Sequence, residues 1–228
     1  MRRLYVFVGI IVLMGLVGYP FVQELEHVSN LKKSKSDFQD TLEERSSATS
    51  PVRKESTAWR RLPSNHRNAL RSLGFYPASL RNNTLSFSLK TLEGGRTRLG
   101  TYSGRWVLIN FWATWCPPCR MEMPSLDKLQ DQFPKKLKVL TINVEQTKET
   151  IRRFKEEYGF TLPVLMDSEG KLARRYGMTG LPESWLITPS GQPLGKLDGP
   201  LEWHNPPATE TFETLFSVTP RNNQGPNK

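Results

Sequence analysis

The stretch FWATWCPPCR, from Phe111 to Arg120, holds both cysteines of the chain, Cys116 and Cys119, with two prolines between them. This C-x-x-C spacing lets the two sulfurs join in a small ring, and a helix that begins here places its N-terminus beneath the first thiol. The two prolines suit a first helical turn, where a missing N–H costs nothing. The preceding run from Trp106 is continuously apolar, which predicts a buried strand leading directly into the pair.

Strand and helix signals alternate around this pair. The strand signals cover residues 85–91, 106–111, 137–144, 162–166, 184–188 and 194–197, and the helix signals cover 126–133, 151–158, 171–176 and 211–216. We expect Pro124 to kink the helix after the cysteines and Gly159 to end the next helix. The order of elements predicts an α/β fold with a mixed central sheet flanked by helices.

A strand, a cysteine pair and a helix in succession form a signature of the thioredoxin type. The segment from about Leu85 to Phe216 resembles the membrane-anchored thiol-disulfide oxidoreductases of the TlpA/ResA/CcmG group, within the thioredoxin superfamily. The matching pieces, in the family's order, are FSLKTLEGG, NFWATWCPPCRMEMPSL, GLPESWLITPSG and GPLEW. The resemblance implies a thioredoxin-like fold that exchanges disulfides with extracytoplasmic protein substrates and receives electrons from a membrane thiol donor. It makes cytochrome c maturation one pathway that the chain could serve.

Thiol-disulfide exchange needs a thiolate that attacks a disulfide sulfur and passes through a mixed disulfide, and it needs no cofactor. Cys116 is predicted to be the exposed nucleophile, because the unpaired N–H groups and the dipole at a helix N-terminus lower the pKa of a thiol there. Cys119, one turn into the helix, is predicted to be more buried. It would resolve the mixed disulfide by attacking Cys116, which releases the reduced substrate.

Three further residues are predicted to contact the substrate. In the family, the proline that matches Pro182 is cis and faces the active-site cysteines. Leu181 stands where threonine or valine is more usual, which alters substrate contacts without abolishing exchange. Trp115, beside Cys116, is predicted to be partly exposed and to dock partner proteins.

Resolution also requires a group that takes the proton of Cys119. Thioredoxins use a buried aspartate six residues before the first cysteine, where this chain has Asn110, and an amide does not accept a proton at neutral pH. Glu183, directly after Pro182, is the predicted base, because partial burial beside a thiol pair would raise its pKa. The alternative for Glu183 is an exposed strand residue without a catalytic part. Glu122 matches the family too, but it could simply decorate the first turns of the helix.

The N-terminal part of the chain predicts a membrane anchor. Residues 4–22 are uncharged and follow two arginines, and their number meets the ~17 to 25 that a bilayer span requires. No small-x-small cleavage site accompanies them, so we expect an uncleaved anchor in the inner membrane with the catalytic domain on the periplasmic side; a cleaved signal peptide is the alternative. Residues 23–84 predict a polar, partly basic tether, in which 68–73 could form a short helix that packs on the domain. The catalytic domain is predicted at 85–218, and a disordered tail at 219–228.

The formal net charge of +10 raises the question of nucleic acid. Residues 85–218 carry 17 basic and 15 acidic side chains, whereas residues 51–81 carry seven basic side chains and one acidic. The excess therefore lies in the predicted tether, where either anionic lipid headgroups or solvent would face it. Since the sequence has no nucleic-acid motif, we expect no nucleic-acid partner.

Other uses of a cysteine pair remain open. A thiol oxidase or isomerase differs from a reductase in reduction potential, which is about −120 mV for a strong oxidant and about −270 mV for thioredoxin. A structural zinc site needs about four ligands, and because His27, His66 and His204 lie far apart, no metal site is predicted. A copper carrier on the same fold would need a histidine near the thiols, and His204 is the candidate. A peroxidase of the peroxiredoxin type is disfavoured because Thr114 lies two residues before Cys116, not three.

Overall fold

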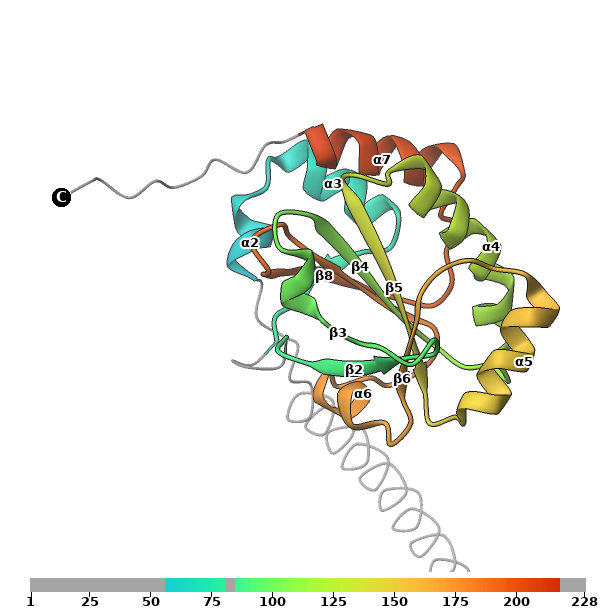
Figure 1. Cartoon of the computed structure of the whole chain (residues 1–228). Coiled ribbons are helices and arrows are strands. Elements are labelled where there is room, and N and C mark those ends of the chain that lie inside the picture. Colours follow the sequence, from blue (N-terminus) through green and yellow to red (C-terminus); the bar gives the residue numbers. More distant parts are fainter. Residues whose placement is uncertain (1–55, 81–84, 218–228) are drawn as a thin grey trace, which may run out of the picture. The chain divides into compact units, whose positions relative to one another are not determined.

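The computed structural model describes residues 56–80 and 85–217 of the 228-residue chain. The strands in this part form one mixed sheet in the order β1-β8-β7-β4-β5-β6-β2-β3 (Figure 1). The strands are β1 (Tyr76–Pro77), β2 (Ser88–Thr91), β3 (Arg96–Arg98), β4 (Trp106–Trp112), β5 (Leu137–Val144), β6 (Val164–Asp167), β7 (Glu183–Ile187) and β8 (Pro193–Asp198). The helices are α2 (Thr57–Arg61), α3 (Ser64–Ser72), the 3-10 helix η1 (Leu99–Tyr102), α4 (Pro117–Gln132), α5 (Lys148–Tyr158), α6 (Lys171–Arg175) and α7 (Pro206–Ser217).

Strand β4 lies at the centre of the sheet and carries the chain into the cysteine pair. It pairs in parallel with β5 on one side and antiparallel with β7 on the other. Every residue of β4 is buried, because helices cover both faces of the sheet. This explains why its sequence is a continuous apolar run and not an alternating one, and it confirms the predicted mixed α/β fold.

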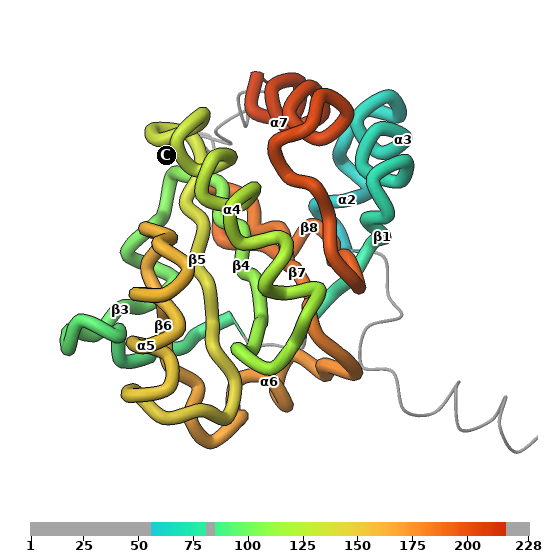
Figure 2. Tube along the Cα trace, turned by 90° about the vertical axis from the view of Figure 1, so that its right-hand side faces the viewer, coloured from blue at the N-terminus to red at the C-terminus, as the bar shows by residue number. Residues whose placement is uncertain are grey.

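Side chains of β4 alternate between two hydrophobic cores. Leu108 and Trp112 belong to the core that α2, α3, α4, α5 and α7 cover, which we call the α4 face. Val107, Ile109 and Phe111 belong to the core that α6 and η1 cover, which we call the α6 face. Figures 1 and 2 show α4 and α7 on one side of the sheet and α6 away from them. Successive residues of a strand point to opposite faces, so a shift of one position moves a side chain from one core to the other.

Helix α4 begins and ends where the sequence predicts, and α5 ends where predicted but begins at Lys148, three residues before the predicted helix signal. Cys116 is the N-cap of α4, and the two prolines that follow occupy its first turn. Pro124 lies inside α4, and the helix ends before Pro134. Thr147 caps the start of α5 by accepting from the backbone N–H of Thr150. Gly159 ends α5 with φ 67°, a left-handed conformation that glycine adopts without steric cost.

The folded domain starts earlier than the boundary at residue 85 that the polar composition predicted. Helices α2 and α3 pack on the α4 face, where Trp59, Leu70 and Phe75 are buried. Strand β1 then pairs antiparallel with β8 and extends the edge of the sheet. Figure 2 shows α3 beside α7, from the other end of the domain. The C-terminal part of the predicted tether is therefore a structural part of the domain, although few of its residues are apolar.

Several predictions fall outside the described residues. The anchor at 4–22, most of the tether before residue 56 and the tail at 219–228 belong to this group. Within 56–80 and 85–217, no helix is long and apolar enough to cross a bilayer.

Candidate active site

The cysteine pair sits at the junction of β4 and α4. Cys116 and Cys119 form a disulfide with a Cα–Cα distance of 5.3 Å. The Cys116 sulfur also accepts the backbone N–H of Cys119, with a donor-to-sulfur distance of 3.3 Å. The prediction that Cys116 is exposed does not hold in this oxidised form, in which Cys116 exposes 3 % of its surface and Cys119 0 %. A sulfur at this N-cap position receives N–H groups and the positive end of the helix dipole, which favours the thiolate of Cys116 once the disulfide is reduced.

A polar network fixes the loop that presents Cys116. The backbone N–H of Thr114 donates to Gln146 Oε1 at 2.7 Å, and Gln146 Nε2 donates to Thr114 Oγ1 at 2.7 Å. Asn143 Nδ2, from the end of β5, donates to the same Gln146 oxygen at 2.8 Å. Two segments distant in sequence thus hold the approach to the cysteines, and nothing in the local pattern around Gln146 predicted this role.

Glu122 is buried on the α4 face, one helical turn after Cys119. Its Oε1 accepts from Asn110 Nδ2 at 2.7 Å, and its Oε2 accepts from Trp203 Nε1 at 3.0 Å and from the backbone N–H of Leu201 at 3.2 Å. Residues three apart on a helix are neighbours on one side of it, so this carboxyl lies on the same side as the buried cysteine. The interpretation of Glu122 as surface decoration is therefore wrong.

The burial of Glu122 changes its acidity. Removal from water raises the pKa of this carboxyl from 4.5 to about 7, although the N–H donors of Trp203, Asn110 and Leu201 favour the charged form. A carboxyl with this pKa exchanges a proton readily at neutral pH, as a general acid and base must. The spacing Cys119 to Glu122 was the sequence signal that could have identified it.

Glu183 lies on the other face of the sheet from the cysteines. It is the cross-strand partner of Phe111, whose ring belongs to the α6-face core, whereas both cysteines belong to the α4-face core. Its Oε2 forms a buried ion pair with Lys196 Nζ at 2.9 Å, and its Oε1 accepts from Trp185 Nε1 at 2.7 Å. Burial raises the pKa of Glu183, as predicted, but its partners are a cation and an indole. The structure therefore contradicts the expectation that Glu183 lies beside the thiols.

Of the predicted substrate-contacting residues, Trp115 lies just before α4, and Leu181 and Pro182 lie in the loop before β7. The Leu181–Pro182 peptide bond is cis, as the resemblance implied. Pro182 is buried, and its carbonyl oxygen accepts the backbone N–H of Gly199 at 2.9 Å. Leu181 is partly exposed and packs against the core that contains both cysteines. Trp115 is 68 % exposed, so its indole is free to contact a partner, and the contact itself remains a prediction.

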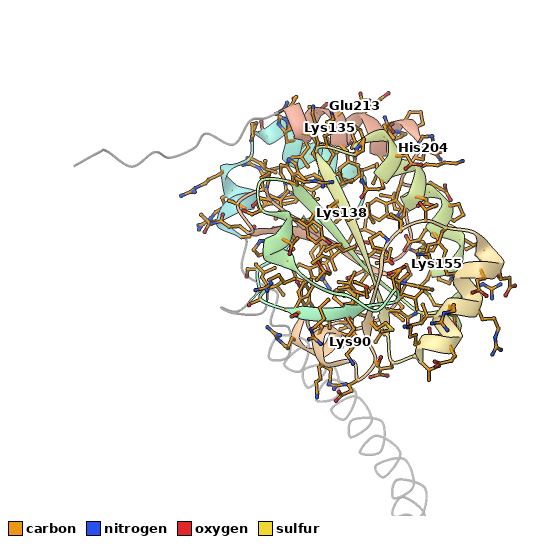
Figure 3. The ribbon with its side chains drawn as sticks, in the orientation of Figure 1. Lys90, Lys135, Lys138, Lys155, His204 and Glu213 are labelled. Carbon is orange, nitrogen blue, oxygen red and sulfur yellow. A yellow bond between two sulfur atoms is a disulfide. The ribbon has the colours of Figure 1, made fainter. Side chains whose placement is uncertain are left out.

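His204 is the histidine that the copper-carrier alternative requires. It is exposed, and Figure 3 shows it at the edge of the domain near α7. Among residues 56–80 and 85–217, no group of three or more His, Cys, Asp or Glu side chains is arranged to hold a metal ion. The described site thus offers a dithiol and a buried carboxyl, which suit disulfide exchange and proton transfer.

Comparison with known proteins identifies the relationship. A model of the AhpC/TSA family matches residues 81–192, which include the cysteine pair and the cis proline. The thioredoxin-like protein YneN of Bacillus subtilis is 40 % identical over 108 residues, which cover 46 % of this chain and 63 % of that protein. The thiol-disulfide oxidoreductase ResA of Geobacillus thermodenitrificans is 37 % identical over 107 residues, which cover 46 % of this chain and 62 % of ResA. The chain is thus similar to AhpC/TSA-family proteins and to thiol-disulfide oxidoreductases of the ResA type. The predicted resemblance is thereby confirmed, and the matches span less than two thirds of these two relatives.

A solved thioredoxin structure agrees with the fold. The exposed lipoprotein thioredoxin Etrx1 of Streptococcus pneumoniae superimposes with a TM-score of 0.51 at 26 % identity. The alignment covers 58 % of this chain and 98 % of Etrx1. A nearly complete Etrx1 domain therefore corresponds to little more than half of this chain.

Proposed function

We propose that this chain is a membrane-tethered thiol-disulfide oxidoreductase that reduces disulfides of extracytoplasmic proteins. The observation that carries the proposal is the arrangement at the start of α4. There, Cys116 is the N-cap residue of α4, Cys119 is buried one turn later, and the Glu122 carboxyl follows on the same side of the helix. The three groups supply a nucleophile, a resolving thiol and a proton acceptor, in that order.

The reaction begins with the reduced pair. The Cys116 thiolate attacks one sulfur of a substrate disulfide, so that a bond between Cys116 and the substrate forms while the substrate S–S bond breaks and its other sulfur leaves as a thiolate. Trp115 and Leu181 contact the segment of the substrate around this disulfide, next to the cis Pro182. The mixed disulfide holds the substrate on the enzyme until Cys119 acts.

Resolution requires Cys119 to lose its proton. The Glu122 carboxylate accepts this proton, and the Cys119 thiolate then attacks the Cys116 sulfur. The Cys116–Cys119 disulfide forms, the bond to the substrate breaks, and the second substrate sulfur leaves as a thiolate. The two substrate thiolates take their protons from water. A membrane thiol donor returns two electrons to the enzyme, and the proton held by Glu122 then returns to Cys119 as its sulfur leaves the disulfide.

The location and the direction of electron flow rest on sequence and on relatives. The uncharged run at 4–22 supports an uncleaved anchor in the inner membrane, with the domain on the periplasmic side. The name of Etrx1 describes that relative as an exposed lipoprotein. Cytochrome c maturation is one pathway that fits a reductase of this kind. A thiol oxidase or isomerase uses the same site, and a reduction potential nearer −120 mV than about −270 mV would favour it.

Trapping tests the proposal directly. The Cys119→Ser variant keeps the nucleophile and loses the resolving thiol, so it should accumulate mixed disulfides through Cys116 in cells, and mass spectrometry can identify the partners. Cys116→Ser is the matched control, because it keeps one thiol and loses the nucleophile. Capture of extracytoplasmic proteins by Cys119→Ser alone supports the proposal. Identical behaviour of the two variants would overturn it.

A further inference from the structure

Asn110 carries a buried oxygen that has no hydrogen-bond partner in the described residues. The residue is fully buried in β4, and its cross-strand partner is Ser184 of β7. Its Nδ2 donates to Glu122 Oε1 at 2.7 Å and to Ser184 Oγ at 3.0 Å, but its Oδ1 is unpaired. A buried carbonyl oxygen without a partner costs about 1 to 3 kcal/mol, so its presence beside the proposed proton acceptor calls for a reason.

The hydrogen-bond donors around Glu122 stabilise only the charged form of its carboxyl. Both carboxyl oxygens face N–H donors, which come from Asn110, the Trp203 indole and the Leu201 backbone. An indole N–H and a backbone N–H have no acceptor capacity. When Glu122 becomes protonated, its new O–H hydrogen faces these donors. The carboxamide of Asn110 is the exception, because its other end is the unpaired acceptor Oδ1.

We propose that the Asn110 carboxamide turns by half a turn when Glu122 takes up a proton, so that Oδ1 accepts the carboxyl hydrogen. The proposal rests on the role of Glu122 proposed above. In the turned state, the Ser184 hydroxyl reverses its part and donates to Oδ1, since a hydroxyl rotates freely between donor and acceptor. The two hydrogen bonds of the amide are kept in both states with their directions reversed, and only the unpaired end changes from oxygen to nitrogen.

The turn makes Asn110 a positioning residue for the proton of Cys119. Without it, protonated Glu122 would place a hydrogen against the Asn110 N–H group, which opposes proton uptake. When the Asn110 amide turns, it forms a hydrogen bond with either the charged or the protonated carboxyl of Glu122, so it favours neither form strongly. A carboxyl held in this way accepts the proton when the mixed disulfide is resolved and returns it when the pair is reduced again. An asparagine can therefore serve at this position although it takes up no proton itself.

The other charged groups around Glu122 do not explain a pH-dependent change at the Asn110 amide. Glu202, in the loop between β8 and α7, is exposed, and Arg120 on α4 is exposed and contacts Tyr158 of α5. Glu183 and Lys196 form their ion pair on the α6 face. The cysteines of the oxidised protein are joined in the disulfide and carry no proton. A titration felt by the Asn110 amide in the oxidised protein near neutral pH is therefore assigned to Glu122.

The test is NMR spectroscopy of the oxidised full-length protein, labelled with ¹⁵N in asparagine and ¹³C in glutamate side chains, between pH 5.5 and 8.5. The ¹³C carboxyl shift of Glu122 reports its protonation, and cross-peaks from the Asn110 amide hydrogens to the Ser184 β-hydrogens report the orientation of the amide. We expect those cross-peaks at pH 8.5 and their loss at pH 5.5, with the midpoint at the Glu122 titration. In Glu122→Gln, the amide signals should not change with pH.

Two variants separate this switch from a structural role. Ser184→Ala removes a group that serves the amide equally in both orientations, so the Glu122 midpoint should stay within about half a pH unit, or about 0.7 kcal/mol. Asn110→Leu keeps the size but removes both donor and acceptor, so the amide can no longer adapt and the resolution rate at pH 7 should fall. Cross-peaks that persist while Glu122 becomes protonated would overturn the proposal. Trapping by Cys119→Ser is independent of this result, so the two proposals can fail separately.

Discussion

Replacing Glu122 by glutamine should remove a pH dependence from the stability of the oxidised protein. Burial raises the pKa of this carboxyl from 4.5 to about 7, so the folded state binds the proton more tightly than the unfolded state does. The stabilisation is fully present below the unfolded value and is lost as the pH rises through 7. At about 1.4 kcal/mol per pH unit, the gap between the two values corresponds to about 3 kcal/mol in total. Most of it, about 2 to 3 kcal/mol, falls between pH 5 and 8.

Urea denaturation of the oxidised protein, followed by tryptophan fluorescence at pH 5 and pH 8, measures this effect. The free energy of unfolding of wild type minus that of Glu122→Gln should fall by the predicted amount between the two pH values. Glu202→Gln is the control, because it removes a nearby but exposed carboxyl and should leave the pH dependence as in wild type. Parallel pH dependences in wild type and Glu122→Gln, within about 0.5 kcal/mol, would refute the assignment of a perturbed carboxyl to Glu122.

Three further predictions follow from the fold and the sequence. Trp59→Ala should lower the free energy of unfolding in urea by about 3 to 5 kcal/mol, because the indole is fully buried in the core of the α4 face. An unchanged urea transition would show that the segment around Trp59 is part of the tether and not of the folded domain. Glu183→Gln should cost about 1.5 to 3 kcal/mol of stability, because it removes one of the two carboxylates that pair with the buried Lys196 and leaves Asp198 as the other. The pH dependence of mixed-disulfide resolution should stay as in wild type, and a shifted profile would restore a catalytic role for Glu183. Protein extracted from membranes should begin at Met1, and a soluble form that starts within residues 17–26 would show that the apolar run is a cleaved signal.

Most of the sheet could be predicted because its strands carry strong local signals. The run ending at Phe111 is apolar throughout, and the central strand β4 ends one residue later, at Trp112. Residues 137–144 form β5 with the predicted bounds. The short helix expected at 68–73 corresponds to the second half of α3, but α2 and β1 could not be predicted in this way, because α2 buries only two residues and β1 has two residues. Such short elements depend on packing against β8, which local periodicity does not reveal.

The candidate site likewise has parts that the sequence predicts and parts that only the folded structure shows. The cysteine pair and the cis proline follow from motifs, but the choice between two glutamates depends on which face each one occupies. Glu183 lies one residue before Ser184, and this single position puts its carboxyl on the α6 face while the serine reaches the α4 face. The helical spacing from Cys119 to Glu122 places the other carboxyl correctly. The partners Trp203 and Leu201 come from a loop distant in sequence, so the burial of Glu122 could be seen only in the folded structure.

The most direct test measures the resolution step on its own. A mixed disulfide between Cys116 and a chromogenic thiol is prepared, and release of the coloured thiolate is followed as Cys119 attacks. We predict complete release in wild type with a rate that rises through about pH 7. Cys119→Ser should release nothing, and Glu122→Gln should be slower by about 100-fold at pH 7 and lack that midpoint. Equal release by Cys119→Ser, or a wild-type rate and pH profile in Glu122→Gln, would contradict the account.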